Sequence, residues 1–226
     1  MSLPRQIEED EFSYTNLNLK LSISNEPSNK IKFIKSKDKR YTASIMPMHE
    51  NFIAVAYYDT DAEEAKPCKE GEFFKNNKLK FHIGLPENDE PMFEKGWNIT
   101  KDILMNNNVG FFKIINKGLK MSDQIGQEGK DITIYAYYDP DKDLAKWQSI
   151  LQTINQHLID AKIPPGKKPS GIKKEERPIS GSSYITYRYD IKSWPPEDLC
   201  AKITVNQNLA DDNKPEGTGF SAALRL

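Results

Sequence analysis

The sequence has few of the residues that form disulfides and metal sites. Its 226 residues include two cysteines and three histidines. Cys68 and Cys200 do not form a CxxC pattern, so two free thiols in a reducing compartment are favoured over a disulfide. The histidines are far apart, and the sequence has neither an HExxH motif nor a Cys/His cluster. We therefore expect no metal ion and no other cofactor.

Long hydrophobic runs and a strong net charge are also absent. No stretch of 18 apolar residues occurs, so no transmembrane helix is expected. The segment from Met1 to Phe12 contains an acidic run and no apolar stretch, and it does not predict a secretory signal peptide. The formal net charge of −1 gives the chain as a whole no attraction to nucleic acid or to an anionic membrane. Any surface that binds phosphate must therefore be local.

The composition, with 37% hydrophobic and 29% charged residues, predicts one domain with tails. Residues 1–28 are polar and predict a flexible N-terminal arm that could dock a partner. Within this arm, residues 16–21 alternate apolar and polar side chains. This pattern predicts either a strand formed against another protein or the first strand of the fold. We expect the domain over residues 29–205 and a C-terminal tail over residues 206–226.

Short strand-like runs alternate with two helical segments. The clearest runs predict strands over residues 52–58, 78–85, 110–116, 131–138 and 183–190. Residues 93–106 are expected to be helical. A second helix is predicted after Asp139 and Pro140, with an apolar stripe at Leu144, Trp147, Leu151, Ile154 and Leu158. This order predicts a single α+β domain with a largely antiparallel sheet and packing helices.

Several of these strands place polar side chains on one face. Lys80 and His82 share a side of their strand, because residues two apart point the same way. Lys113 lies among apolar neighbours, where burial would lower its pKa and make it a usable base. Tyr135 and Arg188 occupy similar positions in two other strands. If the faces converge, they form a site for a dianion. The alternative is that these are ordinary solvated or packing residues, because the periodicity alone predicts only an α+β domain.

Five short motifs follow one another between about residues 50 and 192. They are Lys80-Phe81-His82, Phe112-Lys113-Ile114, Thr133-Ile134-Tyr135, the turn from Lys162 to Pro169, and Tyr184 to Arg188. Lys113 and Tyr135 are 22 positions apart. No single motif is specific, but the ordered set resembles the phosphothreonine lyase effectors (the OspF/SpvC type) that bacteria inject into host cells. The resemblance implies the α+β fold of that family.

The resemblance also implies an activity, the removal of phosphate from phosphothreonine by β-elimination to leave dehydrobutyrine. Lys113 would be the general base and His82 the general acid. Lys80, Arg188 and Tyr135 would bind the substrate phosphate. The resemblance further implies a monomeric virulence effector that is secreted without a cleaved signal peptide. Its partner would be a phosphorylated host protein in the cytosol or nucleus, with a MAP kinase as the usual family target.

Two positions depart from the family pattern. The family has phosphate-binding arginines twelve residues past the base lysine and seven residues past the Tyr-Arg strand, whereas this chain has Ile125 and Pro195. The loss is expected to weaken phosphate affinity, because a charge-assisted hydrogen bond contributes about 1.5–3 kcal/mol. Lys117, Lys120 and the lysines at 167–168 are candidate replacements. Two alternatives stay open: elimination from another phosphoester, and phosphopeptide binding without catalysis.

Overall fold

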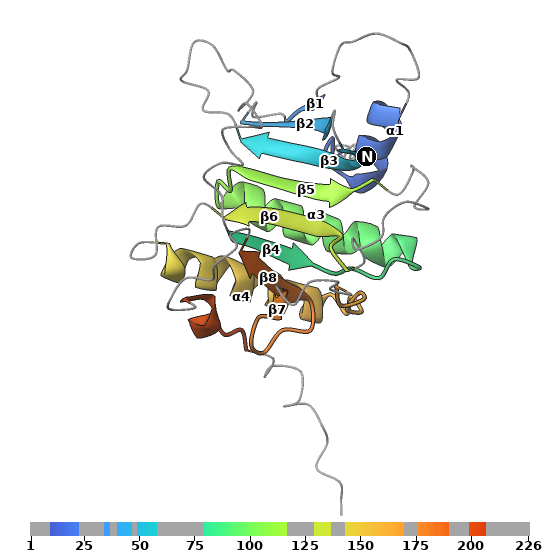
Figure 1. The fold of residues 1–226 in the computed structure, drawn as a ribbon. Coiled ribbons are helices and arrows are strands. Elements are labelled where there is room, and N and C mark those ends of the chain that lie inside the picture. Colours follow the sequence, from blue (N-terminus) through green and yellow to red (C-terminus); the bar gives the residue numbers. More distant parts are fainter. Residues whose placement is uncertain are drawn as a thin grey trace, which may run out of the picture.

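The described part of the chain forms an open antiparallel sheet with helices on one side (Figure 1). The computed structural model describes residues 10–22, 34–36, 40–46, 49–57, 79–116, 129–136, 143–169, 176–189 and 199–206. The eight strands are β1 (Ile34–Lys35), β2 (Tyr41–Met46), β3 (His49–Tyr57), β4 (Leu79–Ile83), β5 (Phe111–Ile115), β6 (Ile132–Ala136), β7 (Arg177–Pro178) and β8 (Ile185–Tyr189). Their order in the sheet is β1-β2-β3-β5-β6-β4-β8-β7. The predicted α+β fold with an antiparallel sheet is confirmed.

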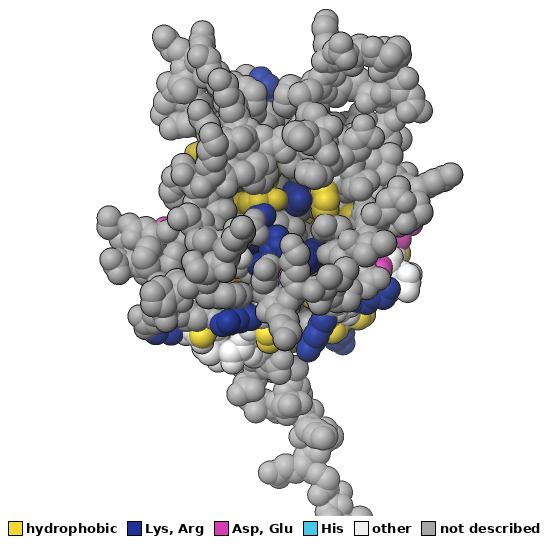
Figure 2. All heavy atoms as spheres, viewed as in Figure 1, with side chains coloured by type: hydrophobic (Ala, Val, Ile, Leu, Met, Phe, Trp, Pro, Cys, Tyr) yellow, Lys and Arg dark blue, Asp and Glu magenta, His cyan; other side chains and the backbone are white. Residues whose placement is uncertain are grey.

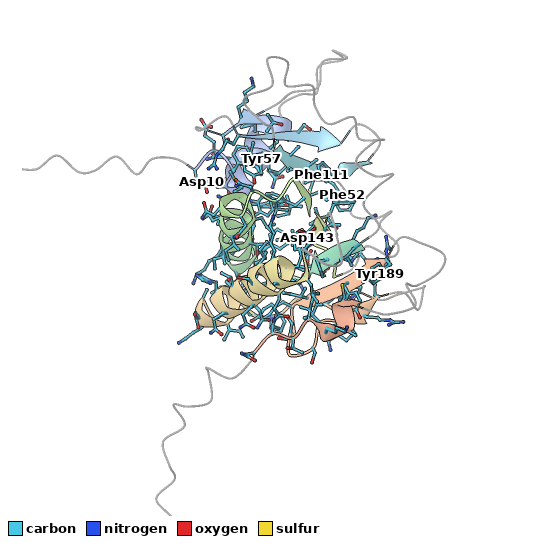
Figure 3. The ribbon with its side chains drawn as sticks, turned by 90° about the vertical axis from the view of Figure 1, so that its left-hand side faces the viewer. Asp10, Phe52, Tyr57, Phe111, Asp143 and Tyr189 are labelled. Carbon is cyan, nitrogen blue, oxygen red and sulfur yellow. The ribbon has the colours of Figure 1, made fainter. Side chains whose placement is uncertain are left out.

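Two long helices cover one face of this sheet. They are α3 (Glu90–Asn106) and α4 (Leu144–Asp160), and shorter helical segments are α1 (Tyr14–Ser22) and the 3₁₀ helix η2 (Leu199–Lys202). Figure 3 shows α3 and α4 on the same side of the strands, and the described residues place no helix over the opposite face. Among the described helices, none has the length and apolar character needed to cross a bilayer.

The ends and faces of the long helices follow from their sequences. The carboxylate of Asp89 accepts a hydrogen bond from the backbone N–H of Met92 at 3.1 Å and caps α3. In α4, the predicted stripe is buried against the sheet at Trp147, Leu151, Ile154 and Leu158. The cap predicted for this helix at Asp139 and Pro140 lies outside the described residues.

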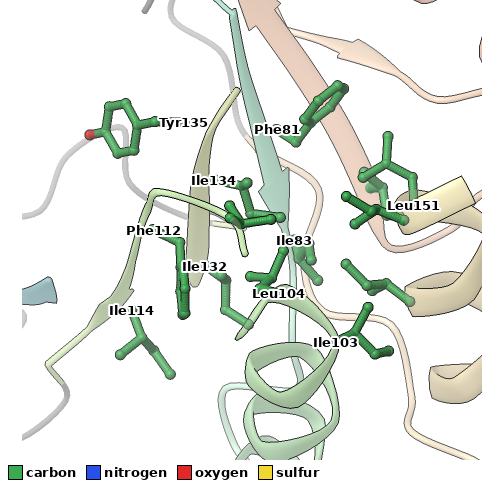
Figure 4. Close-up of a cluster of buried hydrophobic side chains, with 14 of the residues drawn as sticks. Phe81, Ile83, Ile103, Leu104, Phe112, Ile114, Ile132, Ile134, Tyr135 and Leu151 are labelled. Carbon is green, nitrogen blue, oxygen red and sulfur yellow. The ribbon is translucent and has the colours of Figure 1, made fainter. Parts of the chain in front are cut away.

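The core forms where the inward faces of β4, β5 and β6 meet α3 and α4. Its central side chains have no exposed surface and include Phe81, Ile83, Phe112, Ile114, Ile132 and Ile134. Figure 4 shows these side chains beside Leu104 and Leu151, whereas the side chain of Tyr135 points away from that of Ile134. Because strand residues alternate between faces, the residues between these core positions face the opposite side of the sheet.

Residues 16–21 are helical, so the strand predicted for them is wrong. They lie within α1, which packs near α3 and β2. Phe12, Tyr14 and Leu17 are buried, and the indole N–H of Trp97 donates to the carbonyl of Phe12 at 2.9 Å. These contacts with α3 are non-local, and the alternation of Asn and Leu does not reveal them.

The N-terminal segment is also tied to α3 by charge. The ammonium of Lys101, a buried residue, lies 2.5 Å from a carboxylate oxygen of Asp10 and 2.8 Å from one of Asp102. The flexible arm predicted over residues 1–28 is therefore wrong for residues 10–17. The rest of that arm before residue 10 and after residue 22, and the tail after residue 206, lie outside the described residues.

Candidate functional site

The register of four adjacent strands brings the predicted site residues together on the face without helices. In one row across β5, β6, β4 and β8, Lys113 pairs with Thr133, Thr133 with His82, and His82 with Thr186. In a second row, Tyr135 pairs with Lys80 and Lys80 with Arg188. We call these seven residues the polar face. Figure 2 shows Lys and Arg side chains gathered near the middle of this side of the molecule.

The proposed base and the proposed acid are separated by one strand. Lys113 lies on β5 and His82 on β4, with Thr133 of β6 between them. Since neighbouring strands are about 4.8 Å apart, their backbones are roughly 10 Å apart. A substrate residue over Thr133 would therefore have an amine on one side and an imidazole on the other.

Aromatic rings surround the end of the Lys113 side chain. Its ammonium lies 3.7 Å from the centre of the Phe52 ring and 5.9 Å from that of Tyr135. The Tyr135 ring in turn contacts Phe111 edge-on at 5.0 Å. Cation–π and packing contacts of this kind hold a flexible lysine side chain in one place. The end of the Lys113 side chain is therefore held beside Phe52 and Tyr135.

An acidic residue that the sequence did not indicate lies against His82. Oε1 of Glu176 is 2.8 Å from Nδ1 of His82, and the two side chains are 8% and 3% exposed. The approach is short, although it lacks the angle of a hydrogen bond. The hydroxyl of Thr186 donates to Oε2 of Glu176 at 2.9 Å. A carboxylate thus sits over the polar face beside the proposed acid.

A lysine that the sequence did not indicate completes this group. Lys130, just before β6, is buried, and its ammonium lies 3.7 Å from the same Oε1 of Glu176. Of the replacements expected for the missing arginines, Lys167 is exposed and pairs with Glu87 at 3.4 Å. Lys117 and Lys120 lie outside the described residues. We call Lys130 and the three charged residues that act on it, Lys80, Arg188 and Glu176, the cation cluster.

The surroundings of His82 favour its neutral form in the resting protein. Burial lowers the pKa of His82 below its ordinary value of 6.5, and the positive charges of Lys130 and Arg188 lower it further. The Glu176 carboxylate raises this pKa, but it does not compensate for the burial. A neutral imidazole at 82 therefore needs additional negative charge nearby before it can act as an acid.

The pKa values of Lys130 and Glu176, the charged neighbours of His82, are shifted as well. Burial lowers the pKa of Lys130, and Arg188 and Lys80 add to this effect against the opposing charge of Glu176. Burial by itself raises the pKa of Glu176, but the contacts with His82, with the Thr186 hydroxyl and with Lys130 bring it below the ordinary value. Glu176 is therefore an anion at neutral pH.

Mild acid should destabilise the protein through His82. Since the pKa of His82 is lower in the folded than in the unfolded chain, the unfolded chain binds the proton first as the pH falls. The stabilisation is complete above the unfolded pKa of about 6.5. Below it, the free energy of unfolding falls by up to about 1.4 kcal/mol per pH unit, until the folded protein is protonated too.

Urea titrations between about pH 7.5 and pH 5 measure this loss. His82→Asn should lose less unfolding free energy over that range than the wild type. His157→Asn, at an exposed position on α4, is the matched control and should follow the wild type. The contribution of Glu176 has the same sign but is lost only as the pH falls below about 4.5. Parallel curves for all three proteins contradict the prediction.

The turn from Lys162 to Pro169 fixes the end of β4. The backbone N–H of Gly166 donates to the carbonyl of Gly84 at 3.2 Å. A side chain at Gly166 would collide with the backbone of Leu85 and Gly84, so the two segments can approach this closely only with glycine at 166. The turn therefore helps to place β4, which carries Lys80 and His82.

Residue types that bind metal ions, and one of the two cysteines, occur in the part of the chain that the structure describes. There, no three His, Cys, Asp or Glu side chains are placed to hold a metal ion. Cys200 is buried, and its Sγ accepts a hydrogen bond from the Tyr189 hydroxyl at 3.3 Å. Cys68 lies outside the described residues.

Comparison with known proteins identifies the fold. No protein-family model and no curated protein sequence matches the chain. Solved structures do match. The type III effector and phosphothreonine lyase OspF of Shigella flexneri matches with a TM-score of 0.54 and 13% identity, over 86% of this chain and 84% of that one. The phosphothreonine lyase effector VirA (SpvC) of Chromobacterium violaceum matches with a TM-score of 0.54 and 10% identity, over 86% and 96%. The Salmonella plasmid virulence C protein matches with a TM-score of 0.51 and 12% identity, over 84% and 90%. The chain therefore has the fold of the phosphothreonine lyase effectors.

Proposed function

We propose that this protein is a phosphothreonine lyase that removes phosphate from phosphothreonine in a host protein by β-elimination. One observation carries the proposal: an amine at Lys113 and an imidazole at His82 flank Thr133 on a face that also holds Lys80 and Arg188. The likeness to solved phosphothreonine lyases supports it, because it was found from the shape of the fold and not from these side chains.

The reaction needs one base and one acid. Lys113, in its neutral form, takes the Cα proton of the phosphothreonine residue, and the C–H electron pair becomes the Cα–Cβ double bond. The Cβ–O bond breaks, and its electron pair leaves with the phosphate oxygen. His82, in its protonated form, donates a proton to that oxygen. The products are dehydrobutyrine and inorganic phosphate, and no water is consumed.

Binding of the substrate phosphate favours the protonated form of His82. The resting imidazole is disfavoured as a cation by burial and by its cationic neighbours. A phosphate dianion placed among those cations adds negative charge beside the ring, and nearby negative charge raises the pKa of a histidine. Glu176 at 2.8 Å then stabilises the imidazolium on its Nδ1 side. His82 therefore acquires its proton when the substrate that needs it is bound.

The second row of the polar face is suited to hold the phosphate. Lys80 and Arg188 are cross-strand neighbours, so their charges reach the same region. The planar guanidinium of Arg188 can donate to two phosphate oxygens at once. The ammonium of Lys80 lies 4.9 Å from the centre of the Tyr135 ring, and the Tyr135 hydroxyl is our third phosphate-binding group.

Mass spectrometry of a phosphothreonine peptide tests the proposal. We expect free phosphate and a peptide product that is lighter than the unphosphorylated peptide by one water. In heavy-oxygen water the released phosphate should carry no label, because the carbon–oxygen bond breaks. Ordinary threonine with labelled phosphate identifies a phosphatase and contradicts the proposal. Peptide binding without any product identifies a binding module.

The choice of peptide tests the partner. We propose a secreted, monomeric effector whose target is a phosphorylated host protein, and the first peptide to try is a doubly phosphorylated MAP kinase activation loop. The similar structures are described as effectors and as a plasmid virulence protein, which supports this choice. If a sugar-linked or nucleotide-linked phosphothreonine is consumed faster than the peptide, elimination stands and the partner is a different phosphoester.

A further inference from the structure

The Glu176 carboxylate marks a point where negative charge is stabilised on the polar face. His82 and Lys130 both approach its Oε1, at 2.8 and 3.7 Å, and Thr186 donates to its other oxygen. The carboxylate remains ionised although its side chain is only 8% exposed. A phosphate oxygen has the same charge and hydrogen-bonding needs as a carboxylate oxygen. The groups that hold Glu176 can therefore also hold phosphate.

The net charge of the cation cluster can be neutralised by one phosphate dianion. The cation cluster has three cations and the Glu176 carboxylate, so the net charge of these four described residues is +2 while His82 is neutral. A phosphate monoester carries a charge of about −1.5 to −2 at pH 7. Without Lys130 the cluster would have a net charge of only +1. Lys130 thus brings the cluster to the charge that neutralises a fully ionised phosphothreonine.

Lys130 is a buried cation beside the polar face. Burying an ammonium is costly unless anions accompany it. Its ammonium lies 3.7 Å from Oε1 of Glu176, the oxygen that is 2.8 Å from Nδ1 of His82. A phosphate bound at this point would place its negative charge beside the Lys130 ammonium.

We propose that Lys130 is a substrate-binding residue of this site, whose ammonium binds the phosphate of phosphothreonine together with Lys80 and Arg188. This inference rests on the proposed function and deepens it. It also supplies a cation in a chain that has Ile125 and Pro195 at two positions where the resembling family has arginine. This cation comes from the entry to β6, whereas Lys167 of the turn pairs with Glu87.

Binding and kinetics of Lys130→Met test this inference. We expect KM for a phosphothreonine peptide and Kd for inorganic phosphate to rise by about 10-fold or more, as for the loss of one charge-assisted hydrogen bond. The value of kcat should change by less than about 3-fold, because Lys130 takes no part in proton transfer. Lys130→Arg should recover most of the affinity. Lys146→Met, which removes an exposed lysine of α4, should leave all values unchanged.

Stability and salt dependence separate a binding role from a structural one. Lys130→Met should remain folded at the assay temperature, because Glu176 keeps its contacts with His82 and with the Thr186 hydroxyl. Its phosphate affinity should also depend less on ionic strength, since one cation fewer faces the ligand. If Lys130→Met loses affinity only because it unfolds, both expectations fail and the inference is overturned. Lys130→Arg, which keeps the positive charge, is the folded control.

The two proposals fail in different ways. If the wild type consumes the peptide and Lys130→Met keeps its KM and its Kd for phosphate, the lyase stands and the role of Lys130 is refuted. If the wild type binds inorganic phosphate without turnover and Lys130→Met loses that binding, the role of Lys130 stands and the lyase is refuted. A wild type that does not bind inorganic phosphate at all refutes the role of Lys130.

Discussion

Replacing Lys113 with methionine should lower kcat/KM for a phosphothreonine peptide by about 10²- to 10⁴-fold, because the reaction then lacks its base. Methionine has nearly the length of lysine and keeps the contact with the Phe52 ring, which lies 3.7 Å from the ammonium. The folded structure should therefore survive. The measurement is the rate of phosphate release at subsaturating peptide, with the thermal unfolding temperature as the control for folding.

Lys113→Arg separates a base from a phosphate-binding cation. Arginine keeps the positive charge but does not deprotonate in proteins, so it cannot accept the Cα proton. We expect Lys113→Arg to be as inactive as Lys113→Met, while both retain Kd for inorganic phosphate within about 3-fold, because the cation cluster is intact. Substantial turnover by Lys113→Arg would falsify the role of Lys113 as the base.

The parts of the fold that local sequence determines were predictable. The core strands follow from apolar alternation, and α4 follows from a stripe at helical spacing, because both patterns reflect burial on one side. The same alternation predicted which residues of each strand face away from the core. It did not predict strand order or register, since both depend on pairing between distant segments. In the structure, that pairing brings β5, β6, β4 and β8 together and places Lys113 two strands from His82.

The two site residues that the sequence did not indicate were missed for the same physical reason. Glu176 and Lys130 lie beside strand ends and not within periodic segments, so no alternation assigns them a face. Glu176 directly precedes β7, a strand of two residues in a segment that resembles an ordinary basic loop. Only the antiparallel pairing of β7 with β8 brings Glu176 near His82 and Thr186. Residues 10–17 were missed for a related reason, because contacts with α3 determine their burial.

Replacing His82 with asparagine is the second change with a large expected effect. Asparagine cannot donate a proton to the leaving oxygen at a useful rate, so kcat should fall by about 10²- to 10⁴-fold. Inorganic phosphate should still bind, because the cations of the cluster remain. The measurements are single-turnover phosphate release and calorimetric phosphate binding. A variant that loses binding and keeps its rate contradicts the assignment of His82 as the acid.

Glu176→Gln tests how Glu176 controls the acid His82, because it should lower kcat and strengthen phosphate binding. Without the carboxylate at 2.8 Å, the imidazolium loses an anionic neighbour, and the pKa of His82 falls further. Since the acid works only when protonated, the alkaline limb of the kcat profile should move to lower pH, and kcat at neutral pH should fall by about 10-fold. Phosphate should bind more tightly, because Glu176 no longer competes for Lys130. A residue with only a structural role would weaken both functions together, whereas a carboxylate that shares its cations with the substrate strengthens one and weakens the other.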